Sequence, residues 1–218
     1  MGKFRQYSTK HEGNKMEKET KLMLLTSIFV TSVAVSSLIA SKVASFFGIF
    51  AAVGVIAWSI SFPMTDVICE VWGREKAQKV VWIGLICFII TAVLVKIAVY
   101  LPSAPFWENQ KAFATTFELV WRILIAGAIS YIVSQTHDVF SFSFWKKLTK
   151  GKHLWLRNNL STIVSQLIDS ILFTLIVFLG VLELNAILSM IFGVFIIKVI
   201  IAICDTPFVY LLVRWARS

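Results

Sequence analysis

The chain has 218 residues and a net charge of +9, and 58% of its residues are hydrophobic while only 15% are charged. An average soluble domain carries about 25% charged residues, so a soluble globular protein and a disordered chain are both excluded. The length suits one membrane domain without a separate nucleotide-binding domain. Three cysteines, each in or beside an apolar stretch, predict no disulfide framework. These figures indicate a polytopic membrane protein.

In chain order, residues 1–21 form a polar segment that is rich in Lys and Glu, and we expect it to be a disordered cytoplasmic tail. Six apolar stretches follow, each long enough to cross about 30 Å of hydrocarbon at about 1.5 Å per residue. They cover residues 22–42, 48–68, 77–101, 116–144, 157–181 and 184–213. The expected fold class is therefore all-α, with one six-helix transmembrane domain over residues 22–214.

The basic residues gather on one side of this predicted bundle. Of 21 Lys and Arg, sixteen lie in the N-terminal segment, the second and fourth connections or the C-terminus, and only Lys42 and Lys111 lie in connections on the other side. Loops rich in Lys and Arg stay in the cytoplasm, so both termini are expected there. Membrane topology accounts for the positive charge, and we expect the lipid bilayer as a partner and no nucleic acid.

No catalytic or metal-binding motif occurs in the sequence. The three histidines, His11, His137 and His153, are far apart, and Cys-x-x-Cys, His-Glu-x-x-His and Gly-x-Ser-x-Gly are absent. We therefore expect neither an enzyme nor a bound cofactor or metal.

Four of the predicted spans contain an aspartate. Asp66, Asp138 and Asp205 are eight or nine residues from the nearest cytoplasmic basic residue, and Asp169 is twelve residues from one. At about 1.5 Å per residue, all four lie roughly 12–18 Å into the membrane. Each aspartate in the centre of a span costs about 2.5–3.5 kcal/mol. A structural set of ion pairs and helix caps is the alternative, but the shared layer favours a hydrated binding cavity.

Two prolines and one lysine accompany these aspartates. Pro63 is three residues before Asp66, Pro207 is two residues after Asp205, and Lys198 is seven positions before Asp205, where it could pair with a neighbouring helix. A proline inside a membrane helix frees a carbonyl and kinks the helix, which is tolerated where a cavity or a neighbour satisfies the backbone. Interrupted helices point to a transport site, although packing kinks explain either proline alone equally well.

An internal repeat places further polar groups beside two of the aspartates. Residues 130–142 and 161–173 agree at seven of thirteen positions, including Ser-Gln-x-x-Asp and a Phe four residues after the Asp. Gln135 shares a helix face with Asp138, and Gln166 shares one with Asp169, because residues three apart are neighbours on a helix. The two predicted spans run in opposite directions, so they present the same groups from opposed helices.

These residues predict the chemistry of a ligand. Carboxylates accept hydrogen bonds, glutamine both donates and accepts, and Trp58, Trp72 and Tyr131 offer aromatic faces. The set suits a planar ligand with several N–H donors, or a cation. A carboxylate that faces a guanine-like edge can accept two N–H bonds at once.

Two motifs resemble those of a known family. Residues 62–77 read Phe62-Pro63-x-Thr65-Asp66-x-x-x-Glu70-Val71-x-Gly73-x-x-x-Ala77, which resembles the signature of the queuosine precursor transporters, also called the vitamin uptake transporter family. Residues 156–169 read Leu156-Arg157-x-x-x-Ser161-Thr162-x-x-Ser165-Gln166-x-x-Asp169, which is similar to its second signature. The resemblance covers residues 22–214 and implies a six-helix carrier in the bacterial inner membrane that imports deazaguanine precursors of the tRNA base queuosine.

The resemblance also implies functional roles for Asp66, Glu70, Arg157, Gln166 and Asp169. Arg157 is expected at the cytoplasmic mouth, where it could instead hold a carboxylate in the closed state. With the other buried groups, the predicted substrate-binding residues are Asp66, Glu70, Gln135, Asp138, Arg157, Gln166, Asp169, Lys198 and Asp205. The expected substrate is a small heterocycle such as cyano- or aminomethyl-deazaguanine, or queuine.

Two other functions stay open. The chain could be the substrate-binding component of a partner-energised transporter, since Ala40-x-x-x-Ala44 has the small-residue spacing that lets helices approach, and the sequence also allows a homodimer. A ring of carboxylates would suit a proton or cation channel as well. The sequence contains no ATP-binding loop, so energy would come from a gradient, from a partner or from trapping inside the cell.

Overall fold

The computed structural model of the chain describes residues 2–40, 42–46, 49–118, 120–180 and 183–218. Within these ranges the helices are α1 (Gly2–Ile39), α2 (Gly54–Trp72), α3 (Arg74–Tyr100), α4 (Gln110–Glu118), α5 (Val120–Leu148), α6 (Leu154–Phe178) and α7 (Leu184–Arg217). Two short strands, β1 (Val43–Phe46) and β2 (Ile49–Ala52), lie between α1 and α2. They form an antiparallel hairpin in which Val43 pairs with Ala52 and Phe46 pairs with Ile49.

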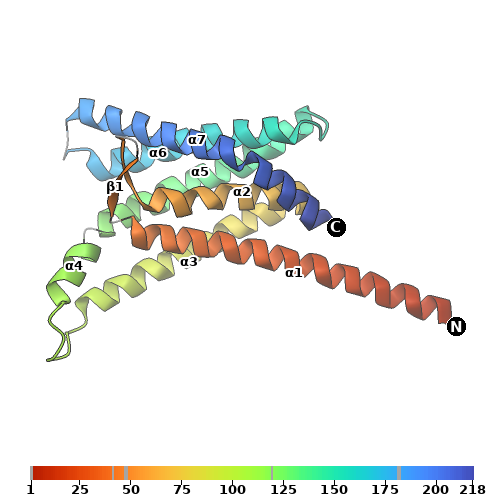
Figure 1. The fold of residues 1–218 in the computed structure, drawn as a ribbon, viewed down its shortest axis with the longest axis horizontal. Helices are drawn as coiled ribbons and strands as arrows, with labels where there is room; N and C mark the ends of the chain where they lie inside the picture. The colour runs from red at the N-terminus through yellow and green to blue at the C-terminus, as the bar shows by residue number, and fades with distance from the viewer. Residues whose placement is uncertain (1, 41, 47–48, 119, 181–182) are drawn as a thin grey trace.

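The long helices lie side by side, and their connections are at two opposite ends (Figure 1). The central element is α2, which packs against α1, α3, α5 and α7, while α6 packs against both α5 and α7. Both termini, the α2–α3 turn and the α5–α6 loop are at one end, and the hairpin and α4 are at the other (Figure 1). The segments predicted to be cytoplasmic therefore share one end of the bundle.

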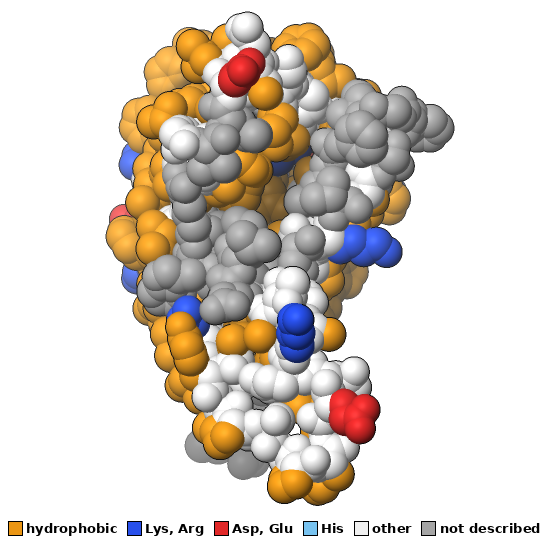
Figure 2. Space-filling model, turned by 90° about the vertical axis from the view of Figure 1, so that its left-hand side faces the viewer, with side chains coloured by type: hydrophobic (Ala, Val, Ile, Leu, Met, Phe, Trp, Pro, Cys, Tyr) orange, Lys and Arg blue, Asp and Glu red, His pale blue; other side chains and the backbone are white. Residues whose placement is uncertain are grey.

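The outer surface of the bundle is apolar. Large hydrophobic side chains are exposed along α3 and α7, among them Ile86, Ile90, Leu94, Ile203 and Phe208. Hydrophobic side chains also line much of the outline in Figure 2, which faces the hairpin end. Five described helices are long and apolar enough to cross a membrane: Glu17–Ile39 of α1, and α2, α3, α6 and α7. A polar interior under an apolar surface is the arrangement that lipid requires, so the chain is a multi-pass membrane protein.

The structure corrects the boundaries of two predicted spans. The second predicted span includes the whole of β2 (Ile49–Ala52), and α2 begins only at Gly54. A short apolar run is compatible with either a strand or a helix, so the all-α expectation missed the hairpin. The fourth predicted span falls on the end of α4 and on α5, which has 29 residues but is not among the five helices above. The number of six spans therefore stays a prediction, and the predicted span ends at positions 48 and 181 lie outside the described residues.

The polar N-terminal segment continues the first helix, although we expected it to be disordered. Lys and Glu favour helices, and Glu17 pairs with Lys21 at 2.8 Å, one turn apart. Lys21 also donates to Ser218 Oγ at 3.3 Å and lies over the ring of Trp215. The last turn of this segment is therefore attached to the end of α7, while its role as a separate cytoplasmic tail stays a prediction.

The small residues near the end of α1 have a different use from the predicted one. Ala40 and Ala44 do not share a helix, because α1 ends at Ile39 and Ala44 lies in β1. Instead, a Cβ at Gly54 would lie 2.6 Å from the carbonyl oxygen of Ser36 and 3.0 Å from Ala40 Cβ. Gly54 and Ala40 therefore let α1 and α2 approach within one chain.

Gly84 of α3 provides a second close approach. A Cβ at this position would lie 2.4 Å from Tyr131 Oη and 2.5 Å from Phe29 Cε1. Tyr131 is fully buried and donates its hydroxyl hydrogen to the carbonyl oxygen of Val81 at 2.8 Å. The ring of Tyr131 therefore has no room to move away, and α1, α3 and α5 meet at this glycine.

We expect Gly84→Ala to lower the free energy of unfolding by about 1–3 kcal/mol, the usual cost of overpacking a filled core. The measurement is the thermal unfolding of the purified protein in one detergent. Ile86→Ala changes an exposed side chain of the same helix and is expected to leave the unfolding temperature unchanged. If Gly84→Ala unfolded at the temperature of the original chain, the close packing described above would be wrong.

Candidate functional site

The interior between α2, α5, α6 and α7 is lined by polar side chains. The buried ones are Ser59, Ser61, Thr65, Asp66, Glu70, Ser130, Ser134, Gln135, Asp138, Ser141, Arg157, Asn158, Ser161, Thr162, Ser165, Gln166, Asp169, Ser170, Thr174 and Lys198. Small hydroxyl residues let membrane helices approach and can bond carbonyls of their own helix. Charged and amide groups within a membrane have to be held inside the protein. This interior is therefore the candidate site.

Three aspartates from three helices lie together in this interior. They are Asp66 of α2, Asp138 of α5 and Asp205 of α7, and we call them the acidic cluster. Asp66 and Asp138 are 1% and 0% exposed. Thr162 of α6 donates to Asp66 Oδ2 at 3.3 Å, and Asp138 faces the hydroxyls of Thr162 and Ser165. The expected convergence is confirmed for these three aspartates.

Asp169 lies apart from the acidic cluster and contacts a cation. Lys198 Nζ of α7 is 2.5 Å from Asp169 Oδ2, and Ser134 Oγ donates to Asp169 Oδ1 at 3.4 Å. Because Ser134 is one helical turn from Asp138, Asp169 lies roughly 5 Å farther along the bundle axis. The prediction that Lys198 pairs with a neighbouring helix is confirmed. This offset of one turn agrees with the predicted depths of roughly 12–18 Å, in which Asp169 is the deepest, but Asp169 pairs with Lys198 and is not part of the acidic cluster.

The internal repeat forms a reciprocal contact between α5 and α6. Ser134 of the first copy donates to Asp169 of the second, and Ser165 of the second copy faces Asp138 of the first. Each serine is four residues before the aspartate of its own copy, so antiparallel packing brings both Ser–Asp pairs together. These two serines were missing from the predicted site, although their identity in both copies of the repeat was the signal that could have found them.

The two glutamines of the repeat have different surroundings. Gln135 Nε2 donates to Ser61 Oγ at 2.9 Å, and its Oε1 accepts from Thr65 Oγ1 at 3.4 Å. Its amide is therefore held by α2. Gln166 is buried too, but its Oε1 has no hydrogen-bond partner among the described residues. Gln166 thus keeps an acceptor that a ligand could use.

Several buried polar atoms in this interior have no hydrogen-bond partner within the described ranges. They are Trp58 Nε1, Asp66 Oδ1, both carboxylate oxygens of Asp138, Asn158 Oδ1, Gln166 Oε1, Ser170 Oγ and Asp205 Oδ1. Each buried polar group without a hydrogen bond lowers the stability of the fold by about 1–3 kcal/mol. Such groups occur chiefly at functional sites. Apart from one N–H group and one hydroxyl, these atoms only accept hydrogen bonds. The set therefore suits a ligand rich in N–H donors, or a cation.

Two of the three predicted stacking residues lie together. Trp58 and Tyr131 are buried edge to face, with 5.5 Å between their ring centroids. Tyr131 is one turn before Ser134, which contacts Asp169, so these rings lie about one turn beyond Asp169 on the side away from Asp138. Trp72 is the last residue of α2, roughly 21 Å along the helix from Trp58 at 1.5 Å per residue, and does not belong to this aromatic pair.

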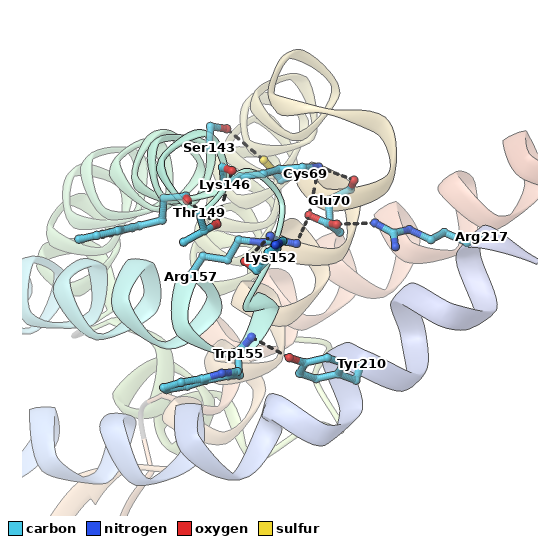
Figure 3. Close-up of polar contacts among 11 residues, drawn as sticks. Cys69, Glu70, Ser143, Lys146, Thr149, Lys152, Trp155, Arg157, Tyr210 and Arg217 are labelled. Atoms are coloured by element: carbon cyan, nitrogen blue, oxygen red, sulfur yellow. Dashed lines mark hydrogen bonds and ion pairs between the residues drawn. The ribbon is translucent and has the colours of Figure 1, made fainter.

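Glu70 gathers three cations at the end of the bundle that carries the termini (Figure 3). Its Oε2 is 2.7 Å from Arg157 Nη2 and 3.0 Å from Lys146 Nζ, and its Oε1 pairs with Arg217. Arg157 is 1% exposed, and its Nη1 donates to the carbonyl oxygen of Lys152 at 3.2 Å. We call Glu70, Lys146, Arg157 and Arg217 the Glu70 cluster. It joins α2, α5, α6 and α7 through one carboxylate.

A cleft of about 460 Å³ lies beside the Glu70 cluster. It is lined by Glu70, Gly151, His153, Leu154, Arg157, Tyr210, Val213, Arg214 and Arg217. The start of α6 and the end of α7 meet here, and Tyr210 Oη accepts a hydrogen bond from the backbone N–H of Trp155 at 3.0 Å. In the part of the chain that the structure describes, no three His, Cys, Asp or Glu side chains are placed to hold one metal ion.

The nine predicted site residues thus fall into separate groups. Asp66, Asp138 and Asp205 form the acidic cluster, and Asp169 pairs with Lys198 one turn away. Both glutamines lie in the same interior, whereas Glu70 and Arg157 bind each other near the end of the bundle. Their roles in substrate binding stay predictions.

Comparison with known proteins places the chain among transporters. A family model described as "Putative vitamin uptake transporter" matches residues 52–212. The chain belongs to this vitamin uptake transporter family. The matched segment includes the whole acidic cluster and the Asp169–Lys198 pair, and it ends before Arg217 of the Glu70 cluster.

Two relatives of this family member have names that state a substrate. The chain is 31% identical over 171 residues to the "Probable queuosine precursor transporter" of Bacillus subtilis (strain 168), which covers 78% of this chain and 74% of the relative. It is 24% identical over 125 residues to the "Queuosine precursor transporter" of Escherichia coli (strain K12), which covers 57% and 54% of the two chains. No solved structure matches the chain.

We expect Lys198→Met to destabilise the protein strongly, because it leaves Asp169 buried without its cation. Removing one partner of a buried ion pair costs about 3–5 kcal/mol. Combining Lys198→Met with Asp169→Asn removes the isolated charge and should restore much of the lost stability. Thermal unfolding of the original chain, both single variants and the double variant in one detergent gives the coupling energy. A coupling energy of zero would contradict the ion pair.

We expect Glu70→Gln to loosen the end of the bundle that carries the termini, because the three cations of the Glu70 cluster then repel one another without their shared carboxylate. Hydrogen exchange of backbone amides should become faster in the first turn of α6 and the last turns of α7. Glu75→Gln changes an exposed carboxylate in the first turn of α3 and serves as the matched control. Equal exchange rates in the two variants would show that the Glu70 cluster does not hold these helices.

Proposed function

We propose that this chain imports queuosine precursors across the bacterial inner membrane, with six spans and both termini in the cytoplasm. Its substrates would be 7-deazaguanines such as cyano- or aminomethyl-deazaguanine, or queuine, which supply tRNA modification. The names of both relatives support this substrate class, and they favour a transporter over a channel. The observation that supports a ligand rich in N–H donors is the set of buried acceptors on α2, α5 and α6 that have no hydrogen-bond partner among the described residues.

Asp66 and Asp138 suit the hydrogen-bonding edge of a deazaguanine. A guanine-like edge presents a ring N–H and an exocyclic amine side by side, and one carboxylate can accept both. Asp66 Oδ1 and both oxygens of Asp138 accept no hydrogen bond from the described residues. Gln166 Oε1 adds a further acceptor, one helical turn from the Thr162 that contacts Asp66. In this proposal Asp66, Asp138 and Gln166 orient the heterocycle.

The charge of the interior favours a cationic substituent on the substrate. Among the residues that the structure describes, no Lys or Arg forms an ion pair with the acidic cluster. An alkylammonium group carries one positive charge and three N–H donors. Aminomethyl-deazaguanine therefore matches the acidic cluster better than cyano-deazaguanine, which lacks that charge.

The Glu70 cluster is suited to close the path to the cytoplasm. It joins four helices, and Asp66 and Asp138 of the acidic cluster are almost fully buried. Release of a substrate toward this end requires some of these ion pairs to separate. The Arg157–Glu70 contact supports the alternative in which Arg157 holds a carboxylate in the closed state rather than the substrate.

Uptake by rescue tests this proposal. Bacteria that can neither make nor import queuosine precursors express the chain and receive cyano-deazaguanine, aminomethyl-deazaguanine or queuine at nanomolar concentration. The readout is the amount of queuosine in their tRNA. Restoration by at least one compound supports the proposal, and no restoration by any of them, with the protein present in the membrane, contradicts it.

We expect Asp66→Asn to weaken uptake, because the amide replaces one acceptor oxygen with a donor and removes the negative charge. Loss of one hydrogen bond to a charged group costs about 1.5–3 kcal/mol, which corresponds to a roughly 10–100-fold weaker apparent affinity. The loss should be larger for aminomethyl-deazaguanine than for cyano-deazaguanine. Glu108→Gln, in the exposed connection between α3 and α4, is the control. Unchanged uptake by Asp66→Asn at equal expression would remove Asp66 from the site.

A further inference from the structure

The cleft beside the Glu70 cluster is lined by more basic side chains than its one carboxylate can neutralise. Its basic lining residues are His153, Arg157, Arg214 and Arg217. The lining includes one carboxylate, that of Glu70, which already accepts from Arg157, Arg217 and Lys146. One negative charge therefore faces several cations, and the cleft has a positive surplus.

Arg157 contributes a buried charged donor without an acceptor. Its Nη1 donates to the carbonyl oxygen of Lys152, and its Nη2 pairs with Glu70. Its Nε is buried and has no hydrogen-bond partner in the ranges that the structure describes. A guanidinium presents its N–H groups as a planar fork that matches phosphate and carboxylate oxygens. This unsatisfied group, only 1% exposed, belongs to the lining of the cleft.

The start of α6 adds to the positive potential. Leu154, its first residue, lines the cleft, and the helix continues for 25 residues. The N-terminus of a long helix carries about half a positive charge and attracts anions. Figure 3 shows Tyr210 of α7 beside this first turn, where it accepts from Trp155. The contact with Tyr210 fixes the helix start against α7, so the cleft has a defined wall on each side.

We propose that this cleft binds a phosphate-type anion, held by Arg157, Arg214, Arg217 and the N-terminus of α6. Two sources offer this chemistry: a soluble phosphate compound, and the headgroup of an acidic phospholipid at the membrane surface. Arg214 lines the cleft and takes no part in the ion pairs of Glu70, so its charge is available to the anion. Arg157 of α6 and Arg217 of α7 would contact both the anion and Glu70 of α2. Binding of the anion therefore weakens the ion pairs that attach α6 and α7 to α2.

Thermal unfolding of the full-length protein without any transport substrate tests the proposal. In a neutral detergent, inorganic phosphate is titrated against sodium chloride at equal ionic strength. In parallel, nanodiscs of phosphatidylcholine alone are compared with nanodiscs that also contain phosphatidylglycerol. We expect a saturable rise in unfolding temperature with phosphate, with phosphatidylglycerol, or with both.

Two variants make the test specific to the cleft. Arg214→Gln removes one charge-assisted contact and should weaken the apparent affinity by roughly tenfold, while it leaves the Glu70 ion pairs in place. Arg74→Gln removes an exposed arginine at the start of α3 that does not line the cleft, and its response should match that of the original chain.

Each outcome decides a point. A response to phosphate alone assigns a soluble ligand, a response to phosphatidylglycerol alone assigns a lipid headgroup, and both support the anion site. No stabilisation beyond that of chloride and phosphatidylcholine, or equal effects of Arg214→Gln and Arg74→Gln, overturns it. This test measures the unfolding temperature without any transport substrate. A negative result here therefore contradicts the anion site alone and leaves the proposed uptake of queuosine precursors untouched.

Discussion

Burial of carboxylates on α2 is the constraint that the rest of the bundle satisfies. Asp66 and Glu70 are one turn apart on this helix, and each has to find partners inside the protein because lipid offers none. Asp66 contacts Thr162 of α6 beside Asp138, while Glu70 collects cations from α5, α6 and α7. Four helices are therefore joined through groups that are costly to expose. A ligand that replaces one of these contacts changes which helices remain attached, and this links binding to movement.

The reciprocal Ser–Asp contacts of α5 and α6 show how one motif yields two different environments. Ser134 faces Asp169 and Ser165 faces Asp138, so each copy of the repeat places a serine beside the aspartate of the other copy. The neighbouring helix then decides which charged group lies beside each aspartate. Next to α2, Asp138 gains a second carboxylate, that of Asp66, whereas next to α7, Asp169 gains the ammonium of Lys198. The interior thus holds an acidic region beside a neutral ion pair.

Predictions from the sequence were correct for properties that local composition determines. They failed for properties that depend on which segments of the chain contact each other. The apolar stretches predicted the long helices, since length and hydropathy alone decide whether a segment can cross lipid. The hairpin at 43–52 was missed, because a short apolar run has the same composition in a strand and in a buried helix. Ala40 and Ala44 were read as a contact for a partner, but α1 ends before Ala44 and the close approach is made with Gly54 instead.

The sequence by itself determined that the chain belongs in a membrane, that its basic segments lie together, and that aspartates, glutamines and one lysine are buried in its spans. Those conclusions follow from residue type and from distance along a helix axis. The tertiary structure alone decided which charges meet: three aspartates together, Asp169 with Lys198, and Glu70 with three cations. Partner choice depends on how each helix is rotated and shifted against its neighbours. Side-chain packing between distant segments sets these two quantities, and the sequence of one segment does not contain them.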